Sequence, residues 1–241
     1  MLQLSGRGPQ LINNTFKHPE LKELSAVKEL NIRSYIGVPI YYKTGSFYGT
    51  LCAVDSKEDS FSGHEISVLQ RYSNLFSYVI ELEKKAYHDS LTELFNRSFL
   101  EENFTYIIEK GALFLIDLDG FKEVNDTYGH DTGDNILKEA SSRIESCLDS
   151  SEIAVRLGGD EFVILVPGVV EDNKLKDKGE QLIYCLSDWK NSRLEINISA
   201  SVGIAKYPEH ANDLSSLLKA ADTAMYAAKR DGGSQLHFQY K

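Results

Sequence analysis

The sequence has little cysteine, little positive charge and no long apolar run. Its three cysteines, Cys52, Cys147 and Cys185, stand far apart along 241 residues without a Cys-x-x-Cys pair, which excludes a disulfide framework and a zinc knuckle. A reducing compartment is therefore expected, and we predict a cytoplasmic protein. No stretch approaches the roughly 18 apolar residues of a membrane span, and residues 1–9 lack the order of a signal peptide, so we expect no membrane partner for this chain.

Positive charge is scarce as well. The 26 Lys and Arg residues against 36 Asp and Glu residues give a formal net charge of -10, which argues against a protein that binds the phosphate backbone of nucleic acids or an anionic membrane. With 42% hydrophobic and 26% charged residues, the composition is that of a folded globular protein. The length allows two compact units.

The first third of the chain carries a hairpin pattern and the start of a helix. Strand-like residues 35–42 and 47–54 flank a turn at Lys43-Thr44-Gly45-Ser46. Ser62, followed three residues later by Glu65, has the form of a capping box, which predicts that a helix begins there.

Apolar residues recur along this predicted helix at alternating four- and three-residue intervals, the spacing that lets two helices pack side by side. The helix is expected to end at residues 87–90. One interpretation is a dimer stalk; the other is an amphipathic helix lying on its own domain, because the seam lasts for fewer than three heptads. The seam residues are Val68, Tyr72, Leu75, Val79, Leu82 and Ala86.

From about residue 89 the pattern changes to alternating strands and helices, which predicts an α+β domain with helices packed on a mixed sheet. Strands are expected at residues 113–118, 153–157, 162–166 and 196–205. Helices are expected at residues 135–148, 174–189 and 214–229. The polar segment 121–134 is interpreted as a binding loop.

Two short segments of this domain carry carboxylates at strand ends. Gly158 and Gly159 form a predicted turn, where glycine permits positive φ and leaves the backbone open to a ligand, and Asp160 and Glu161 follow at once. A strongly apolar strand runs directly into Asp117. Because magnesium uses one or two carboxylates together with waters and phosphates, Asp117 and Asp160 on adjacent strands would suffice to bind it. The alternative is a hairpin turn and strand ends whose acids are only solvated.

These segments together resemble the GGDEF-domain diguanylate cyclases over about residues 87–237. Segment 88–97 is similar to the family's opening motif, with Glu93 where glycine is usual, and segments 201–205 and 220–229 are similar to its closing motifs. The central residues that carry the resemblance are Asp117-x-Asp119-x-Phe121-Lys122-x-x-Asn125-Asp126-x-x-Gly129-His130-x-x-Gly133-Asp134 and Gly158-Gly159-Asp160-Glu161-Phe162.

The resemblance implies a fold and a reaction. The fold is a central, mainly antiparallel sheet flanked by helices, like that of nucleotidyl cyclases and polymerase palms. The reaction condenses two GTP molecules into cyclic di-GMP and two pyrophosphates, by attack of a 3′-hydroxyl on an α-phosphate across a dimer in which each domain presents one GTP. A nucleic-acid polymerase, which shares the metal chemistry, is disfavoured by the net charge and by the lack of a basic template-binding stretch.

The resemblance also implies roles for single residues. Asp117, the Leu118 carbonyl and Asp160 would hold Mg²⁺, or Mn²⁺ in its place. Glu161 would assist at the metal, and either Asp160 or Glu161 would help to deprotonate the hydroxyl. Lys122 would stabilise phosphate charge.

Substrate binding is implied for a further set of residues. Asn125 and Asp134 would face the guanine, because a carboxylate can accept from the ring N–H and the exocyclic amine, which adenine does not present together. Simpler alternatives are that Asp134 is the N-cap of the following helix and that Lys229 is a solvated cation at a helix end. The other implied GTP-binding residues are Phe121, Gly158, Gly159 and Lys229.

The sequence departs from the family's pattern at two places. Gly233 stands where the family often has an arginine, so no side chain contacts phosphate from that position. Either Arg230 substitutes for that arginine, or GTP binds more weakly. Asp149-Ser150-Ser151-Glu152 replaces the Arg-x-x-Asp product-inhibition motif, so feedback inhibition at that site is not expected. The first departure keeps an alternative function open: a catalytically weak or inactive domain that binds GTP or cyclic di-GMP and signals through a partner.

Segments 35–40 and 49–55 resemble the last half of a GAF sensory domain, and the size of the N-terminal segment predicts a partial domain. We therefore expect a GAF-like sensory or dimerisation segment (1–62), a connecting helix (63–88) and a GGDEF domain (89–241). The expected partners are GTP, a second copy of this chain through the connecting helix and N-terminal segment, and downstream cyclic di-GMP receptors, with no nucleic acid.

Overall fold

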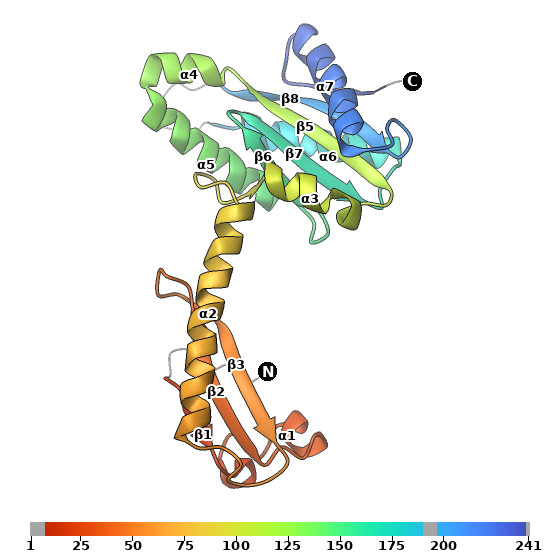
Figure 1. The fold of residues 1–241 in the computed structure, drawn as a ribbon. Coiled ribbons are helices and arrows are strands. Elements are labelled where there is room, and N and C mark those ends of the chain that lie inside the picture. Colours follow the sequence, from red (N-terminus) through yellow and green to blue (C-terminus); the bar gives the residue numbers. More distant parts are fainter. Residues whose placement is uncertain (1–7, 190–196, 240–241) are drawn as a thin grey trace. The chain divides into compact units, whose positions relative to one another are not determined.

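A computed structural model of the chain describes residues 8–189 and 197–239 (Figure 1). Its contacts divide the chain into two units, Met1–Lys85 and Ala86–Lys241. Among the described residues, one sheet has three strands and the other has six. The two units are described separately below.

The sheet of the first unit is antiparallel, in the order β1-β2-β3. The predicted hairpin is confirmed, because β2 and β3 pair along their length across a turn at residues 42–46. Two short helical segments precede β2. The bounds are β1 (Gln10–Ile12), η1 (Thr15–Lys17), α1 (Ser25–Glu29), β2 (Ser34–Tyr41) and β3 (Phe47–Asp55).

Helix α2 (Gly63–Tyr87) begins at the predicted capping box. The Ser62 backbone N–H donates to the Glu65 carboxylate at 2.7 Å, and the Ser62 hydroxyl oxygen accepts from the His64 N–H at 3.2 Å. One face of α2 contacts β2, where the buried Ser73 hydroxyl donates to the Pro39 carbonyl at 2.7 Å. This bond replaces the water that Ser73 gives up on burial.

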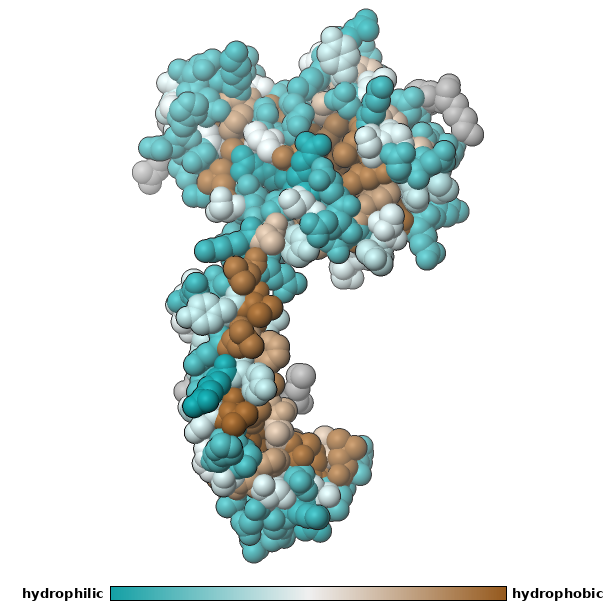
Figure 2. Space-filling view, in the orientation of Figure 1, coloured by the Kyte–Doolittle hydropathy of each residue, from teal (hydrophilic) through white to brown (hydrophobic). Residues whose placement is uncertain are grey.

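The apolar seam of α2 does not lie on the first unit. Its large side chains are between 37% and 66% exposed, and Figure 2 shows hydrophobic residues along this helix. These exposed residues are Val68, Tyr72, Leu75, Val79 and Leu82. A solvent-facing apolar stripe of this kind favours a partner surface over an intramolecular one.

The sheet of the second unit has the order β4-β6-β7-β5-β8-β9. The two outermost pairs, β4 with β6 and β8 with β9, are parallel, and the other pairs are antiparallel. The predicted mainly antiparallel sheet is therefore confirmed. The bounds are β4 (Phe95–Asn96), β5 (Gly111–Asp119), β6 (Ile153–Gly158), β7 (Glu161–Pro167), β8 (Ser199–Tyr207) and β9 (Leu236–Phe238).

Helices cover both faces of this sheet, because successive strand residues point to opposite faces. In β5, Phe114 and Ile116 share a core with α4, α5 and α6, whereas Leu113 and Leu115 share a core with α3 and α7. The bounds are α3 (Arg97–Ile107), α4 (Phe121–Tyr128), α5 (His130–Ser146), α6 (Asp172–Ser187) and α7 (Leu214–Arg230).

Two predictions for this unit need correction or restriction. The segment 121–134 is not a loop: it forms α4 and the first turns of α5, broken only at Gly129, whose φ of 83° suits glycine. Its polar side chains are exposed on the helices, which is why the composition resembled that of a loop. Residue 196, expected to begin a strand, lies outside the described residues, and β8 begins at Ser199. Within the described part of the chain, no helix has both the length and the apolarity needed to cross a bilayer.

Candidate active site

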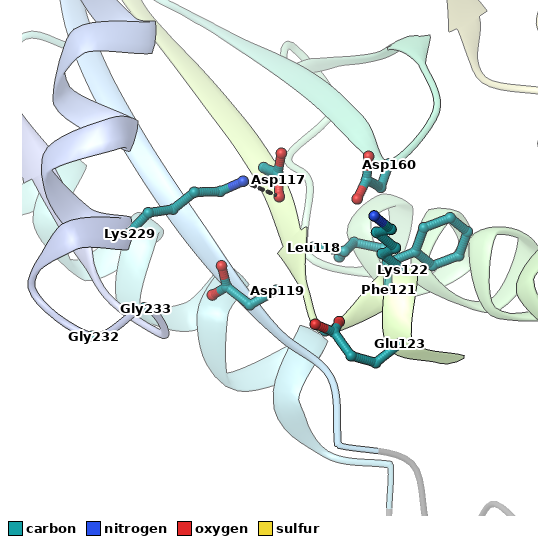
Figure 3. Close-up of a pocket in the computed structure, with 11 residues that line it drawn as sticks. Asp117, Leu118, Asp119, Phe121, Lys122, Glu123, Asp160, Lys229, Gly232 and Gly233 are labelled. Atoms are coloured by element: carbon teal, nitrogen blue, oxygen red, sulfur yellow. Dashed lines mark ion pairs between the residues drawn. The ribbon is translucent and has the colours of Figure 1, made fainter. Parts of the chain in front are cut away.

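A cavity of about 380 Å³ lies where β5 ends and α4 begins, between the β6–β7 turn and the C-terminal end of α7 (Figure 3). Three segments that are distant in sequence contribute to it, namely residues 117–123, Asp160 and residues 229–233. Six residues implied as functional by the sequence line this one pocket, namely Asp117, Leu118, Phe121, Lys122, Asp160 and Lys229. Asp119, Gly120, Glu123, Gly232 and Gly233 complete the lining.

The strand period directs Asp117 toward α7. Asp117 follows Leu113 and Leu115 on the same face of β5, the face that α7 covers. Lys229 lies in the last turn of α7, and its ammonium nitrogen is 2.6 Å from the Asp117 carboxylate. This ion pair shows that Lys229 is not only a solvated helix-end cation, and that Asp117 attracts a positive charge at this position.

Asp160 is brought to Asp117 by the β6–β7 turn. The Leu118 N–H donates to the Asp160 backbone carbonyl at 3.3 Å, which ties the turn to the end of β5. Burial, followed by the charge of Asp117, raises the pKa of the Asp160 carboxyl above its ordinary value. In Figure 3 the Lys122 side chain points to the side of the pocket where Asp160 lies. The Asp160 carboxyl, whose ionisation is disfavoured beside the carboxylate of Asp117, is a group that a bound cation would stabilise in its charged form.

Glu161 lies directly across from Asp117 in the β5–β7 ladder. Glu161 is not among the residues that line the pocket, but its side chain lies on the same face of the sheet as that of Asp117. Burial, with the charges of Asp117, Asp160 and Asp222, raises the pKa of the Glu161 carboxyl. Like charges placed opposite each other on neighbouring strands are unfavourable, so this arrangement stores repulsion that a bound cation would relieve.

The turn glycines behave as the sequence predicted. Gly158 and Gly159 have φ values of 144° and 55°, in the region that favours glycine, and a Cβ at either position would meet no atom within 4 Å. The backbone of the turn is therefore open to an approaching ligand.

The guanine-side candidates lie together on α4 and α5, outside the pocket lining. The Asn125 amide rests on Gly133, where any Cβ would overlap its oxygen, and Gly133 immediately precedes Asp134. Asp134 is exposed and lies inside α5, whose N-cap is Gly129. The alternative in which Asp134 caps this helix is therefore wrong, because α5 begins at His130, earlier than expected.

Phe121 and Lys122 form the first turn of α4 and have opposite environments. The Phe121 ring is only 8% exposed and belongs to the core, whereas Lys122 is exposed. Gly120 precedes them with a φ of 83°, and a Cβ there would overlap the Asn197 carbonyl. Phe121 therefore anchors the helix start that aims Lys122 into the pocket.

Sequence reasoning did not assign a role to Asp119, which organises the opposite wall. Its carboxylate accepts from the Ser201 hydroxyl at 2.9 Å, the Ser199 hydroxyl at 3.2 Å and the Ser234 N–H at 2.9 Å. These bonds hold the first residues of β8 and the loop after α7 against the end of β5. Only the alternation of acids in Asp117-Leu118-Asp119 could have indicated that both acids share one face.

Two family models match the chain. A model of the diguanylate cyclase GGDEF domain matches residues 86–235, and a model of the GAF domain matches residues 3–80. The chain belongs to the GGDEF diguanylate cyclase family. This GGDEF protein is 33% identical to diguanylate cyclase DgcP of Escherichia coli over 232 residues, which cover 85% of this chain and 67% of DgcP.

Other relatives share mainly the second unit. The chain is 41% identical over 160 residues to the bifunctional diguanylate cyclase/cyclic di-GMP phosphodiesterase MucR of Pseudomonas aeruginosa, with 63% of this chain and 23% of MucR covered. The structure of the coiled coil and GGDEF domain of DgcB from Caulobacter crescentus, in complex with c-di-GMP, matches 73% of this chain and 97% of that chain with a TM-score of 0.64 at 26% identity. The GGDEF domain of TpbB from Pseudomonas aeruginosa matches 64% and 94% with a TM-score of 0.58 at 35% identity. The GGDEF protein thus spans two thirds of DgcP but about a quarter of MucR.

Proposed function

We propose that this GGDEF protein is a diguanylate cyclase that condenses two GTP molecules into cyclic di-GMP and two pyrophosphates. The observation that carries the proposal is the pocket that unites Asp117 and Lys122 with Asp160 and Lys229, from three segments that are distant in sequence. Two carboxylates and two ammonium groups around one cavity are the side chains that a nucleoside triphosphate with its divalent cation requires.

The donor set fits a divalent cation. Asp117 and Asp160 offer carboxylate oxygens as hard ligands in one pocket, and the Leu118 backbone carbonyl offers a third oxygen. These ligands suit Mg²⁺ or Mn²⁺, because such ions take one or two protein carboxylates and keep waters and substrate phosphates as further ligands. When bound, the cation offsets phosphate charge during attack of the 3′-hydroxyl on the α-phosphorus.

The chain's own residues then divide the work. Lys122 and Lys229 bind the triphosphate, and Lys229 exchanges its Asp117 partner for phosphate oxygens when the substrate enters. Asp160 or Glu161, each with a raised pKa, accepts the hydroxyl proton. Asn125, whose amide rests on Gly133, and Asp134, the next residue along α5, bind the guanine. The open Gly158-Gly159 backbone and Phe121 complete the GTP site.

The reaction requires two domains, because each presents one GTP to the other. The exposed seam of α2 suits a second copy of this chain, since burying five large apolar side chains between two helices is strongly favourable. The GAF-matched segment then sets the geometry of the dimer, and cyclic di-GMP receptors read its product.

The dimer is tested by a Leu75→Glu/Leu82→Glu double variant. Light scattering after size exclusion should show a dimer for the parent and a monomer for the double variant, with cyclase activity lost in parallel. Asn74→Glu adds a charge one position from Leu75 but outside the seam, and it should keep both dimer and activity. A monomeric parent with constant specific activity at all protein concentrations would contradict this part of the proposal.

Catalysis is tested by incubating the purified chain with GTP and Mg²⁺ and detecting cyclic di-GMP by chromatography. Asp160→Ala should abolish product, whereas Asp177→Ala, an exposed acid on α6, should not. If the parent binds GTP at high concentration but forms no product, the chain is a nucleotide-binding signalling domain, the function that Gly233 would favour.

A further inference from the structure

The structure places two cysteines together that the sequence keeps far apart. Cys147 is the C-cap of α5, and Cys185 lies in the last turn of α6, 38 residues later. The Cys147 thiol donates to the Cys185 sulfur across 2.7 Å. Both are free thiols in the second unit, at the C-terminal ends of α5 and α6. Neither cysteine lines the pocket described above.

The backbones on both sides of this pair are held by reciprocal contacts. Arg143, one turn before Cys147 in α5, donates to the Cys185 carbonyl at 3.0 Å and to the Asp188 carbonyl at 2.6 Å. Lys178 of α6 donates to the Cys147 carbonyl at 2.8 Å. Each cysteine's own carbonyl is thus bound by a cation from the other helix, so the two sulfurs are kept within reach.

Further contacts strengthen each clamp. The Arg143 guanidinium stacks over the buried Trp189 ring at 4.3 Å from its centroid. The Lys178 side chain is only 12% exposed, and its ammonium pairs with Glu152 at 2.6 Å. A disulfide needs sulfurs about 2.05 Å apart, so only a small side-chain adjustment separates this thiol pair from a bond.

We propose that Cys147 and Cys185 are a modification site that forms an intramolecular disulfide on exchange with a low-molecular-weight disulfide such as oxidised glutathione. The bond links the C-terminal ends of α5 and α6. The thiol pair of this chain, not a metal or a lone reactive cysteine, is the reacting unit.

The exchange proceeds in two balanced steps. The partly exposed Cys185 gives up its proton and attacks one sulfur of oxidised glutathione, forming a mixed disulfide and releasing one glutathione thiolate, which takes up a proton. Cys147 then loses its proton and attacks the Cys185 sulfur, forming the Cys147–Cys185 bond and releasing the second glutathione. Two protein thiols are oxidised by two electrons, and one glutathione disulfide is reduced to two thiols.

The environments of the two cysteines set this order. Cys147 is only 6% exposed, and burial, followed by its hydrogen bond to Cys185, raises the pKa of its thiol to about 11. External reagents therefore reach Cys185 first, and Cys147 reacts once Cys185 carries the mixed disulfide beside it.

The test uses the full chain with Cys52→Ser, which removes the exposed cysteine of the first unit and leaves only the pair. The folded protein is incubated with oxidised glutathione, quenched with acid, denatured and alkylated, and its intact mass is measured. The expected product is a monomer that takes up no alkyl group and has lost two hydrogen atoms, with a peptide joining Cys147 to Cys185. Two alkylated cysteines, a persistent glutathione adduct or an intermolecular disulfide would each overturn the proposal.

Single variants separate the two steps and control for folding. Cys147→Ser should accumulate a stable glutathione adduct at Cys185, because the resolving thiol is absent. Cys185→Ser should keep an unmodified thiol at Cys147, because that thiol is buried. Circular dichroism identifies any variant that fails to fold, and the mass of the Cys52→Ser chain itself decides the proposal without either variant.

Discussion

Arg156 binds Asp89 and the glycine turn with a single guanidinium. Its Nη1 lies 2.8 Å from the Asp89 carboxylate, and its Nε and Nη2 donate to the Gly159 carbonyl at 3.1 and 2.8 Å. The Arg156 side chain is only 10% exposed. The opening motif of the GGDEF domain is therefore tied to the turn that carries Asp160, a connection that joins residues 67 positions apart.

Removing the charge of Asp89 should destabilise the second unit. Asp89→Asn keeps the size of the side chain but leaves Arg156 with a neutral partner in a partly buried position, so the free energy of unfolding should fall by about 2 kcal/mol. Urea unfolding at pH 7 measures the change. A cycle with Arg156→Met controls for non-specific effects: if the two single changes simply add in the double variant, the residues are not coupled.

The same carboxyl gives a pH dependence. Burial opposes ionisation of Asp89, but hydrogen bonds from Thr92 and Arg156 outweigh it and lower its pKa from the ordinary 3.8. A carboxyl whose pKa is lower in the folded state contributes stability that is complete above the unfolded value and is lost as the pH falls through the folded value. The stability difference between the parent and Asp89→Asn should therefore be constant from pH 7 to pH 5 and shrink below about pH 4. If the stability difference instead shrinks between pH 7 and pH 5, a group other than Asp89 causes the pH dependence.

The backbone conformation at Glu93 favours glycine, the residue that is usual at this position of the family's opening motif. Its φ is 63°, a left-handed conformation that is unfavourable for a side chain with a Cβ. Glu93→Gly should raise the free energy of unfolding by about 1 kcal/mol, measured by urea denaturation. Glu93→Ala keeps the Cβ and should give no such gain; an equal gain from both changes would mean that the glutamate side chain, not the backbone, is the cause.

Gly233 is constrained by Asp119. Its φ is 73°, and a Cβ there would lie 3.0 Å from the Asp119 carboxylate. Gly233→Ala should lower the free energy of unfolding by about 1 kcal/mol and, because Asp119 lines the pocket, raise the KM for GTP. Gly232→Ala also carries a backbone cost, at a φ of 112°, but its Cβ would meet no atom within 4 Å. Although Gly232 lines the same pocket, this variant should raise the KM for GTP less than Gly233→Ala does, and an equal rise in both variants would remove Asp119 from the explanation.

Cyclic di-GMP should not inhibit the proposed cyclase through the position of the family's product-inhibition motif. That position carries Asp149 and Glu152, and the nearby Lys178 ammonium already pairs with Glu152 at 2.6 Å. Two carboxylates repel a phosphodiester, so the rate should stay within about twofold when product is added in excess over enzyme. The double variant Asp149→Arg/Glu152→Asp restores the Arg-x-x-Asp motif. If cyclic di-GMP inhibits this variant but not the parent, the missing motif is the cause of the parent's insensitivity. Strong inhibition of the parent would place a product site elsewhere.

Much of the fold could be predicted because local patterns reflect local causes. The hairpin of residues 34–55 follows from alternation around a glycine turn, and α2 follows from the Ser62–Glu65 capping box. The segment 121–134 misled because its polar residues lie on exposed helix faces, where composition alone does not separate a helix from a loop.

The sequence by itself determined which elements are present: acids at strand ends, a glycine pair free to adopt positive φ, and an apolar seam on one helix. These depend on residue type and on neighbours within a few positions. Only the tertiary structure decided that Lys229 reaches Asp117, that Arg156 joins Asp89 to the turn, and that Cys147 meets Cys185. Such contacts depend on strand order and helix packing, which bring together residues whose separation in the chain carries no information about their distance in space.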